Sequence, residues 1–140
     1  MNMPIIVIGG NHHNTLAVLR SLGEKGVKSL LIVISNDPKP YVGYSKYIQL
    51  IKVINSEDEI ASAMYSLHKS SEKAVVIACS DAISSYLDNN RNRLSEDFIL
   101  PGSVEEGKIT RLMNKNTMMQ VAIDPTFAYY DHMTLTFENA

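Results

Sequence analysis

Two short loops carry the residues that could bind an anion. Gly9, Gly10 and Asn11 follow one apolar run, and Ser80 and Asp81 follow another. Glycines let the backbone approach a ligand closely, and the free N–H groups at a helix start attract negative charge. The glycine pair serves equally well as a plain strand-to-helix turn, and Asp81 as a helix cap. These five residues are our candidate binding site for a small anionic substrate.

Three other side chains invite catalytic or metal chemistry, and we expect none of them to perform it. His12 and His13 have no Cys, Asp or Glu partner at metal-ligand spacing, so we predict an exposed or helix-capping role. Cys79 lacks any sequence feature that would supply a base, so we predict a small buried residue. The loop also lacks the later glycines of the dinucleotide fingerprint. The sequence thus predicts no catalytic residue and no metal site.

The strands that would position these loops can be recognised as apolar runs bounded by turn residues. Such runs are typical of strands buried on both faces, as in a parallel sheet. The expected strands are residues 4–8, 28–34, 47–53, 73–79 and 98–100. Polar residues alternate along 47–53, which predicts a shorter strand near a sheet edge. In an open parallel sheet, ligands bind beyond the carboxyl ends of the strands, where both candidate loops lie.

Helices are expected between these strands. A helix over residues 13–25 should be closed by Gly23 and Gly26. Two capping boxes, Ser56 to Glu59 and Ser103 to Glu106, predict further helix starts, and the helix after Ser80 should extend towards Leu94. Strands alternating with helices predict an α/β fold, specifically a Rossmann-like three-layer αβα domain with a mostly parallel sheet of about five strands.

Bulk composition excludes several classes of protein. The chain has 140 residues, of which 45% are hydrophobic and 20% charged, which fits one globular domain. A net charge of -2 gives no basic surface for nucleic acid or for a membrane. The sequence has no apolar run long enough to span a membrane, and we expect no signal peptide. The single cysteine excludes an intrachain disulfide. We therefore expect a cytoplasmic protein that binds neither nucleic acid nor membrane.

The order of several short motifs resembles the ATP-grasp ligases. Ile8-Gly9-Gly10 with Asn14, and the run over residues 16–26, resemble the opening of these enzymes. Ser45-Lys46-Tyr47, Ser80-Asp81 and Asn114-Lys115 then follow in the family's order. The resemblance spans residues 4 to 123 and is greatest to the carboxylate–amine ligase branch. That branch includes carbamoyl-phosphate-synthase-like and D-aspartate-ligase-like proteins.

The resemblance implies a pre-ATP-grasp domain over residues 1–113. In such enzymes ATP and Mg²⁺ serve to phosphorylate a carboxylate, which an amine then attacks. The amino-terminal domain lies on the side of the small-molecule carboxylate or amine substrate, and the lysine corresponding to Lys115 lies near the nucleotide. Residues 114–140 would begin the ATP-grasp region and end in a divergent tail. We therefore expect a truncated chain whose partner is the missing catalytic domain. It should neither catalyse the reaction nor bind a cofactor tightly.

Two other interpretations remain open at this stage. The same sheet and glycine loop would also suit a self-contained nucleotide-binding or regulatory module of Rossmann or flavodoxin type. Alternatively, an apolar face that another domain would cover could pair with a second copy of the chain to give a homodimer.

Overall fold

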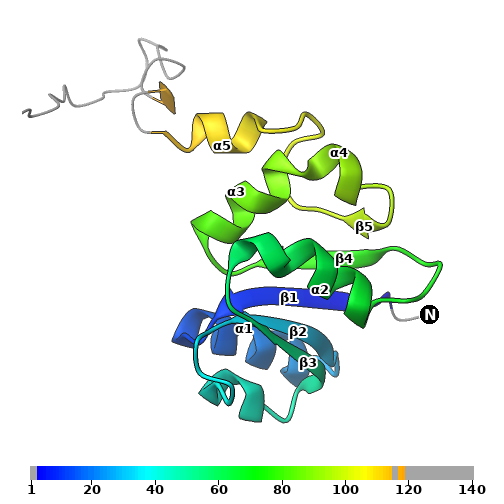
Figure 1. Ribbon diagram of the computed structural model, residues 1–140. Coiled ribbons are helices and arrows are strands. Elements are labelled where there is room, and N and C mark those ends of the chain that lie inside the picture. Colours follow the sequence, from blue (N-terminus) through cyan, green and yellow to red (C-terminus); the bar gives the residue numbers. More distant parts are fainter. Residues whose placement is uncertain (1–2, 115–116, 119–140) are drawn as a thin grey trace, which may run out of the picture. The chain divides into compact units, whose positions relative to one another are not determined.

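One parallel sheet of five strands organises the protein (Figure 1). The computed structural model describes residues 3–114 and 117–118. The strands are β1 (Ile5–Gly10), β2 (Ser29–Ile34), β3 (Ile48–Ile54), β4 (Ala74–Ala78) and β5 (Phe98–Ile99). Their spatial order is β3-β2-β1-β4-β5, and all four pairings are parallel. The predicted Rossmann-like α/β fold, with a parallel sheet of five strands, is confirmed.

Helices follow the strands in alternation. They are α1 (His13–Glu24), η1 (Tyr41–Tyr44), η2 (Glu57–Glu59), α2 (Ile60–Leu67), α3 (Asp81–Asn89), α4 (Arg91–Leu94) and α5 (Lys108–Leu112), where η marks a short 3₁₀ helix. The contacts divide the chain after Thr110, and the first unit, Met1–Thr110, contains the sheet. In the described part of the chain, no helix is long and apolar enough to cross a membrane.

Side chains of the central strands alternate between two cores, one on each face of the sheet. Val7, Leu31 and Val33 pack with Leu19 of α1 and with Val42 of η1. Their neighbours in the strands point to the opposite face and meet α2, α3 and α4. Because successive strand residues face opposite sides, a continuous apolar run buries both faces at once. This is the physical basis of the three layers.

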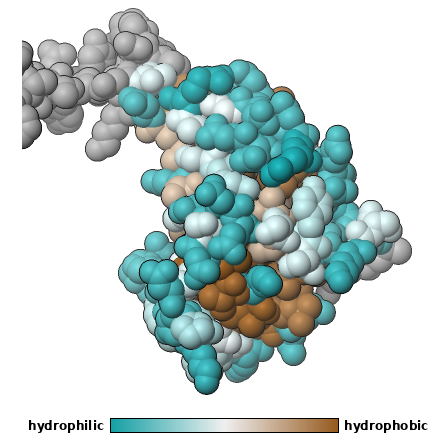
Figure 2. Space-filling view, viewed as in Figure 1, coloured by the Kyte–Doolittle hydropathy of each residue, from teal (hydrophilic) through white to brown (hydrophobic). Residues whose placement is uncertain are grey.

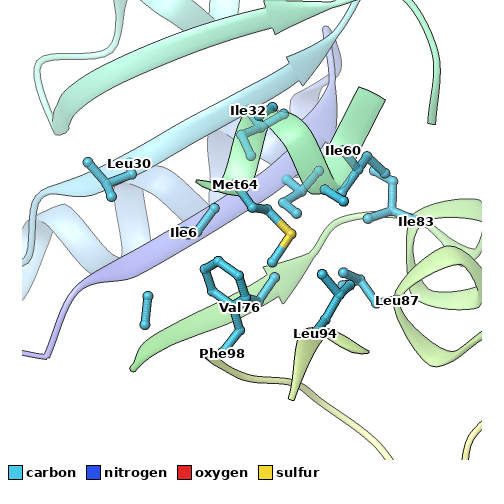
Figure 3. Close-up of a cluster of buried hydrophobic side chains, with 14 of the residues drawn as sticks. Ile6, Leu30, Ile32, Ile60, Met64, Val76, Ile83, Leu87, Leu94 and Phe98 are labelled. Carbon is cyan, nitrogen blue, oxygen red and sulfur yellow. The ribbon is translucent and has the colours of Figure 1, made fainter. Parts of the chain in front are cut away.

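The larger core is centred on Phe98 and Met64 (Figure 3). Phe98 is 1% exposed and lies among side chains from β1, β4, α2 and α4. Tyr65 contacts the Phe98 ring edge-on, with ring centroids 5.2 Å apart. Burying an aromatic side chain of this size contributes about 1.5–3 kcal/mol. The two-residue strand β5 thus anchors the sheet edge largely through one side chain.

The opposite edge of the sheet is formed by β3, as its alternating pattern predicts. Leu50 and Ile51 are 52% and 40% exposed, and Figure 2 shows apolar surface gathered over this strand. The expectation of a shorter strand was wrong, because β3 has seven residues. Its length follows from the register with β2, which continues from Ser29 to Ile34 across one irregularity.

Several helix boundaries differ from the predictions. The Ser56 side chain makes no capping hydrogen bond, whereas Glu59 accepts one from the Asn55 N–H at 3.0 Å. The first capping pattern is nevertheless followed directly by η2 and then by α2, whereas the second does not start a helix, since α5 begins at Lys108. The predicted helix towards Leu94 is interrupted at Asn90, whose side-chain amide donates to the Tyr86 carbonyl at 2.8 Å. The backbone of Asn90 is not helical, with φ of -116° and ψ of 16°, so this side-chain bond accompanies the break between α3 and α4.

A buried ion pair fixes the turn between α3 and α4. Asp88 and Arg91 are 2% and 7% exposed, and Oδ1 of Asp88 lies 3.8 Å from Nε of Arg91. The other carboxylate oxygen of Asp88 accepts from both the N–H and the hydroxyl of Thr110, at 2.8 and 2.9 Å. Arg91 donates to the Pro101 carbonyl. This cluster therefore connects α3 and α4 to Thr110 in α5 and to Pro101 in the loop after β5.

Replacing Asp88 should destabilise the fold. Asp88→Ala leaves the Arg91 guanidinium buried without its carboxylate, a loss that typically costs about 3–5 kcal/mol. The free energy of unfolding, measured by urea denaturation, should fall accordingly. Asp58→Ala is the matched control, because Asp58 is exposed and its loss should change stability by less than about 0.5 kcal/mol. Equal midpoints for the two variants would show that the cluster contributes nothing.

Candidate functional site

An open hollow lies where the strand order reverses. After β1 the chain builds β2 and β3 on one side, and it then crosses to build β4 and β5 on the other side. The carboxyl ends of β1 and β4 diverge there, as in other doubly wound sheets. The hollow has a volume of about 390 Å³. It is lined by Gly10, His12, Asn14, Thr15, Ile34, Glu57, Cys79, Ser80 and Ile83.

The first wall of the hollow is the start of α1. The Gly10 carbonyl accepts hydrogen bonds from the His12 N–H and from the Thr15 hydroxyl, both at 2.8 Å. His12 is the N-cap residue, and its Nδ1 accepts from the Asn14 N–H at 3.4 Å. The predicted capping role of His12 is therefore confirmed.

Gly9 lets α1 approach the sheet closely. A Cβ atom at Gly9 would lie 2.1 Å from Oγ1 of Thr15 and 3.0 Å from Cβ of Cys79. At Gly10, by contrast, the nearest atom to such a Cβ would be the Ile34 carbonyl oxygen at 4.0 Å. Gly9 is thus required by packing, whereas Gly10 leaves open space at the hollow. Close packing against Thr15 therefore accounts for a glycine at position 9 and does not account for one at position 10.

The second wall is the start of α3. Ser80 is its N-cap, and the Ser80 hydroxyl accepts from the Ile83 N–H at 3.3 Å. The Ser80 carbonyl accepts from both the N–H and the hydroxyl of Ser84, each at 3.0 Å. The first N–H groups of a helix have no backbone partner within that helix, so those that the caps do not bond remain available to a ligand. The starts of α1 and α3 both line the hollow, and their partial positive charge makes the hollow favourable for an anion.

One carboxylate lies at the rim. Glu57 belongs to η2, on the connection between β3 and α2, and its side chain is exposed. Sequence reasoning did not assign Glu57 to the site, because it lies inside the Ser56 to Glu59 capping pattern. The rule that ligands bind beyond the carboxyl ends of strands could have identified it, since it follows β3 by three residues.

The candidate residues from the sequence separate into two groups. Gly10 and Ser80 line the hollow. Gly9 lies beneath it, and Asn11 instead accepts a hydrogen bond from the Val42 N–H at 3.3 Å. Asp81 is the exposed first residue of α3, so the cap of that helix is Ser80 and not Asp81. Lys115, the expected nucleotide-binding residue, lies outside the described residues.

The reactive side chains near the hollow show no catalytic arrangement. Cys79 is half-buried, and burial raises the pKa of its thiol, while a side-chain hydrogen bond with Thr15 lowers it to a smaller extent. The His12 and His13 rings lie with their centroids 3.8 Å apart. Over residues 3–114 and 117–118, no group of three or more His, Cys, Asp or Glu side chains is arranged to hold a metal ion.

Comparison with known proteins adds no further assignment. No protein-family model matches the sequence, and neither a curated protein nor a solved structure matches the chain significantly. The fold and the hollow define the class: an α/β domain of Rossmann-like topology with a hollow at its switch point.

The two adjacent glycines should respond differently to the same substitution. Gly9→Ala forces the Thr15 side chain or α1 to move, and such overpacking costs about 1–3 kcal/mol. Gly10→Ala meets only the Ile34 carbonyl oxygen, at an ordinary contact distance of 4.0 Å, and should leave the thermal midpoint of unfolding nearly unchanged. Gly9→Ala combined with Thr15→Ala should recover part of the loss. Equal destabilisation by the two glycine substitutions would contradict the packing role of Gly9.

The Cys79 thiol should react slowly in the folded protein. Its raised pKa keeps it protonated at neutral pH, and the thiolate is the reactive form. Alkylation by iodoacetamide at pH 7.5 should be much slower in buffer than in urea. The pKa of the Cys79 thiol is higher in the folded protein than in the unfolded one, so the folded protein favours the neutral thiol. At neutral pH the thiol is neutral in both states, and its full contribution to stability is present. That contribution is lost as the pH rises through the folded value. Equal alkylation rates in both solvents would show that the thiol is not protected.

Proposed function

We propose that this chain is the substrate-side domain of an ATP-dependent carboxylate–amine ligase of the ATP-grasp type. In this proposal the hollow between β1 and β4 binds the small-molecule substrate. ATP and Mg²⁺ would supply the phosphorylation of the carboxylate from a catalytic domain, as in the enzymes that the sequence resembles. The described residues of this chain bind and orient the substrate.

One observation carries the proposal: two helices begin at the same hollow, at the switch point of the sheet. A carboxylate placed there meets the N–H groups at the starts of α1 and α3 that the His12 and Ser80 caps leave unbonded, and the partial positive charge at both helix starts stabilises it. The order of the motifs Gly9-Gly10, Ser45-Lys46-Tyr47 and Ser80-Asp81 supports the assignment to this enzyme class.

The Glu57 carboxylate at the rim limits which charged groups a substrate can place beside it. Glu57 would repel a second anion, whereas it would attract an ammonium group. A ligand that carries both groups, such as a small amino acid, satisfies the helix starts and Glu57 together. The volume of about 390 Å³ is at the lower end of the range for ligand pockets, which suits a small molecule better than a dinucleotide.

The missing glycines of the dinucleotide fingerprint support the same choice. His12 and Asn14 occupy the beginning of α1, where a pyrophosphate would need close backbone approach. The alternative, a nucleotide-binding or regulatory module, would require ATP, NAD or FMN to occupy this hollow. The experiment below distinguishes the two.

Amide chemical shifts of the ¹⁵N-labelled chain should respond to a small amino acid. Titration with aspartate, with acetate and with methylamine separates the roles of the two charges. We expect saturable shifts at Gly10, Asn14 and Ser80 at millimolar aspartate. Acetate should produce weaker shifts at the same amides, because it lacks the ammonium group. Glu57→Gln should weaken aspartate binding several-fold and leave acetate binding unchanged or stronger.

Glu96→Gln is the matched control, since Glu96 is exposed and does not line the hollow. It should bind aspartate as the unmodified chain does. Saturable shifts at Gly10 and Ser80 with ATP, NAD or FMN, and none with aspartate or acetate, would replace the ligase proposal with the nucleotide-binding module. No shift at these amides with any of the ligands would overturn both.

A further inference from the structure

We propose a second binding site, in a groove between α1 and residues 41–47, for a nucleoside phosphate. The groove has a volume of about 550 Å³. Its lining residues are Leu16, Arg20, Glu24, Tyr41, Tyr44, Ser45, Lys46 and Tyr47. None of them lines the hollow between β1 and β4. The proposal therefore does not depend on the proposed function.

The floor of the groove is built by close packing of Tyr47 against α1. A Cβ atom at Gly23 would lie 2.0 Å from Cγ of Tyr47, so the absence of a side chain at Gly23 lets the ring rest on the helix backbone. The Tyr47 carbonyl accepts from the Ser29 N–H at 3.1 Å, where β2 begins. The first contact holds the ring against α1 and the second fixes the backbone that carries it, so this part of the groove exists before a ligand arrives.

The opposite wall, η1, is also anchored. Val42 is fully buried in the core beneath α1, and its N–H donates to Oδ1 of Asn11 at 3.3 Å. The Gly43 N–H donates to the Pro40 carbonyl at 2.9 Å. A buried side chain and backbone hydrogen bonds thus fix the segment that carries Tyr41 and Tyr44. Preorganisation of this kind reduces the entropy lost on binding.

The tyrosines present aromatic surface to solvent. Tyr41 and Tyr44 are 49% and 76% exposed, although both belong to a segment whose Val42 is fully buried. Tyr47 adds a third ring to the same groove. Large exposed aromatic side chains that gather around a concavity are typical of binding sites. A flat heterocycle can stack on such rings, as nucleobases do on aromatic side chains.

The charges of the groove select an anion. Arg20 and Lys46 contribute two positive charges, against the single carboxylate of Glu24. Neither cation forms a salt bridge with another described residue. Nζ of Lys46 lies 5.1 Å from the centroid of the Tyr47 ring, so a cation and an aromatic face are adjacent. Arg and Lys are the common phosphate-binding side chains.

Together these features match one ligand chemistry: a planar ring joined to a phosphate. The volume is within the range of small-molecule pockets, and it exceeds that of the hollow between β1 and β4. The Ser45-Lys46-Tyr47 motif supplies the cation and the fixed ring. Within this proposal the motif recognises a nucleoside phosphate.

Titration of the ¹⁵N-labelled full chain with AMP tests the proposal. We expect saturable shifts at the amides of Arg20, Tyr44 and Tyr47. Adenosine and inorganic phosphate should each bind at least tenfold more weakly than AMP, because each supplies only half of the ligand. Lys46→Gln and Arg20→Gln should each weaken AMP binding about tenfold, and Tyr44→Ser should weaken both AMP and adenosine.

Lys69→Gln is the matched control, since it removes one exposed lysine outside the groove and should leave AMP binding unchanged. Circular dichroism should show the same thermal midpoint for every variant. AMP binding that is unaffected by Lys46→Gln and Arg20→Gln would overturn the proposal. AMP shifts confined to Gly10 and Ser80 would also overturn it, as would the absence of any shift at millimolar AMP. Failure here leaves the aspartate titration of the other site unaffected.

Discussion

The central position of β1 is the constraint on which the rest of the structure depends. Ile6 pairs with Leu30 of β2 on one side and with Val76 of β4 on the other, and both pairings are parallel. A parallel neighbour can be reached only by a crossover over a sheet face. Because β2 and β4 lie on opposite sides of β1, the crossovers that lead to them run in opposite directions. The loops after β1 and β4 therefore separate, and the hollow is the space between them.

Helix α1 is fitted to this sheet at both ends by a glycine contact. At its start, Thr15 occupies the space above Gly9, and near its end, Tyr47 occupies the space beside Gly23. At the first contact the missing side chain is that of Gly9 in the sheet, and at the second it is that of Gly23 in the helix. Thr15 lines the hollow at the start of α1, and Tyr47 lines the groove along its later turns. The two candidate sites thus depend on the same helix placement.

The sequence predicts the elements of this fold better than their contacts. Continuous apolar runs identify β1, β2 and β4, because burial on both faces leaves no room for polar residues. Helix ends were less predictable: Ser56 fits a capping box, yet Glu59 bonds the Asn55 N–H instead. Local spacing also cannot show that the Asp88 carboxylate bonds Thr110, since that contact depends on how the chain returns after β5.

The sequence predicted only those residues of the candidate site that lie at the ends of recognisable strands. Gly10 and Ser80 were identified because Gly10 ends β1 and Ser80 follows β4 after Cys79, so both lie at the carboxyl ends of adjacent strands. Glu57 was not, because it lies inside the Ser56 to Glu59 capping pattern, which accounted for it as part of a helix start. The chain must pass from β3 across the sheet to β4, and η2 begins that crossover at the hollow. The connection from β3 to β4 therefore supplies a negative charge to the hollow between β1 and β4. Under the proposed function, this charge favours an ammonium-bearing carboxylate over a simple anion.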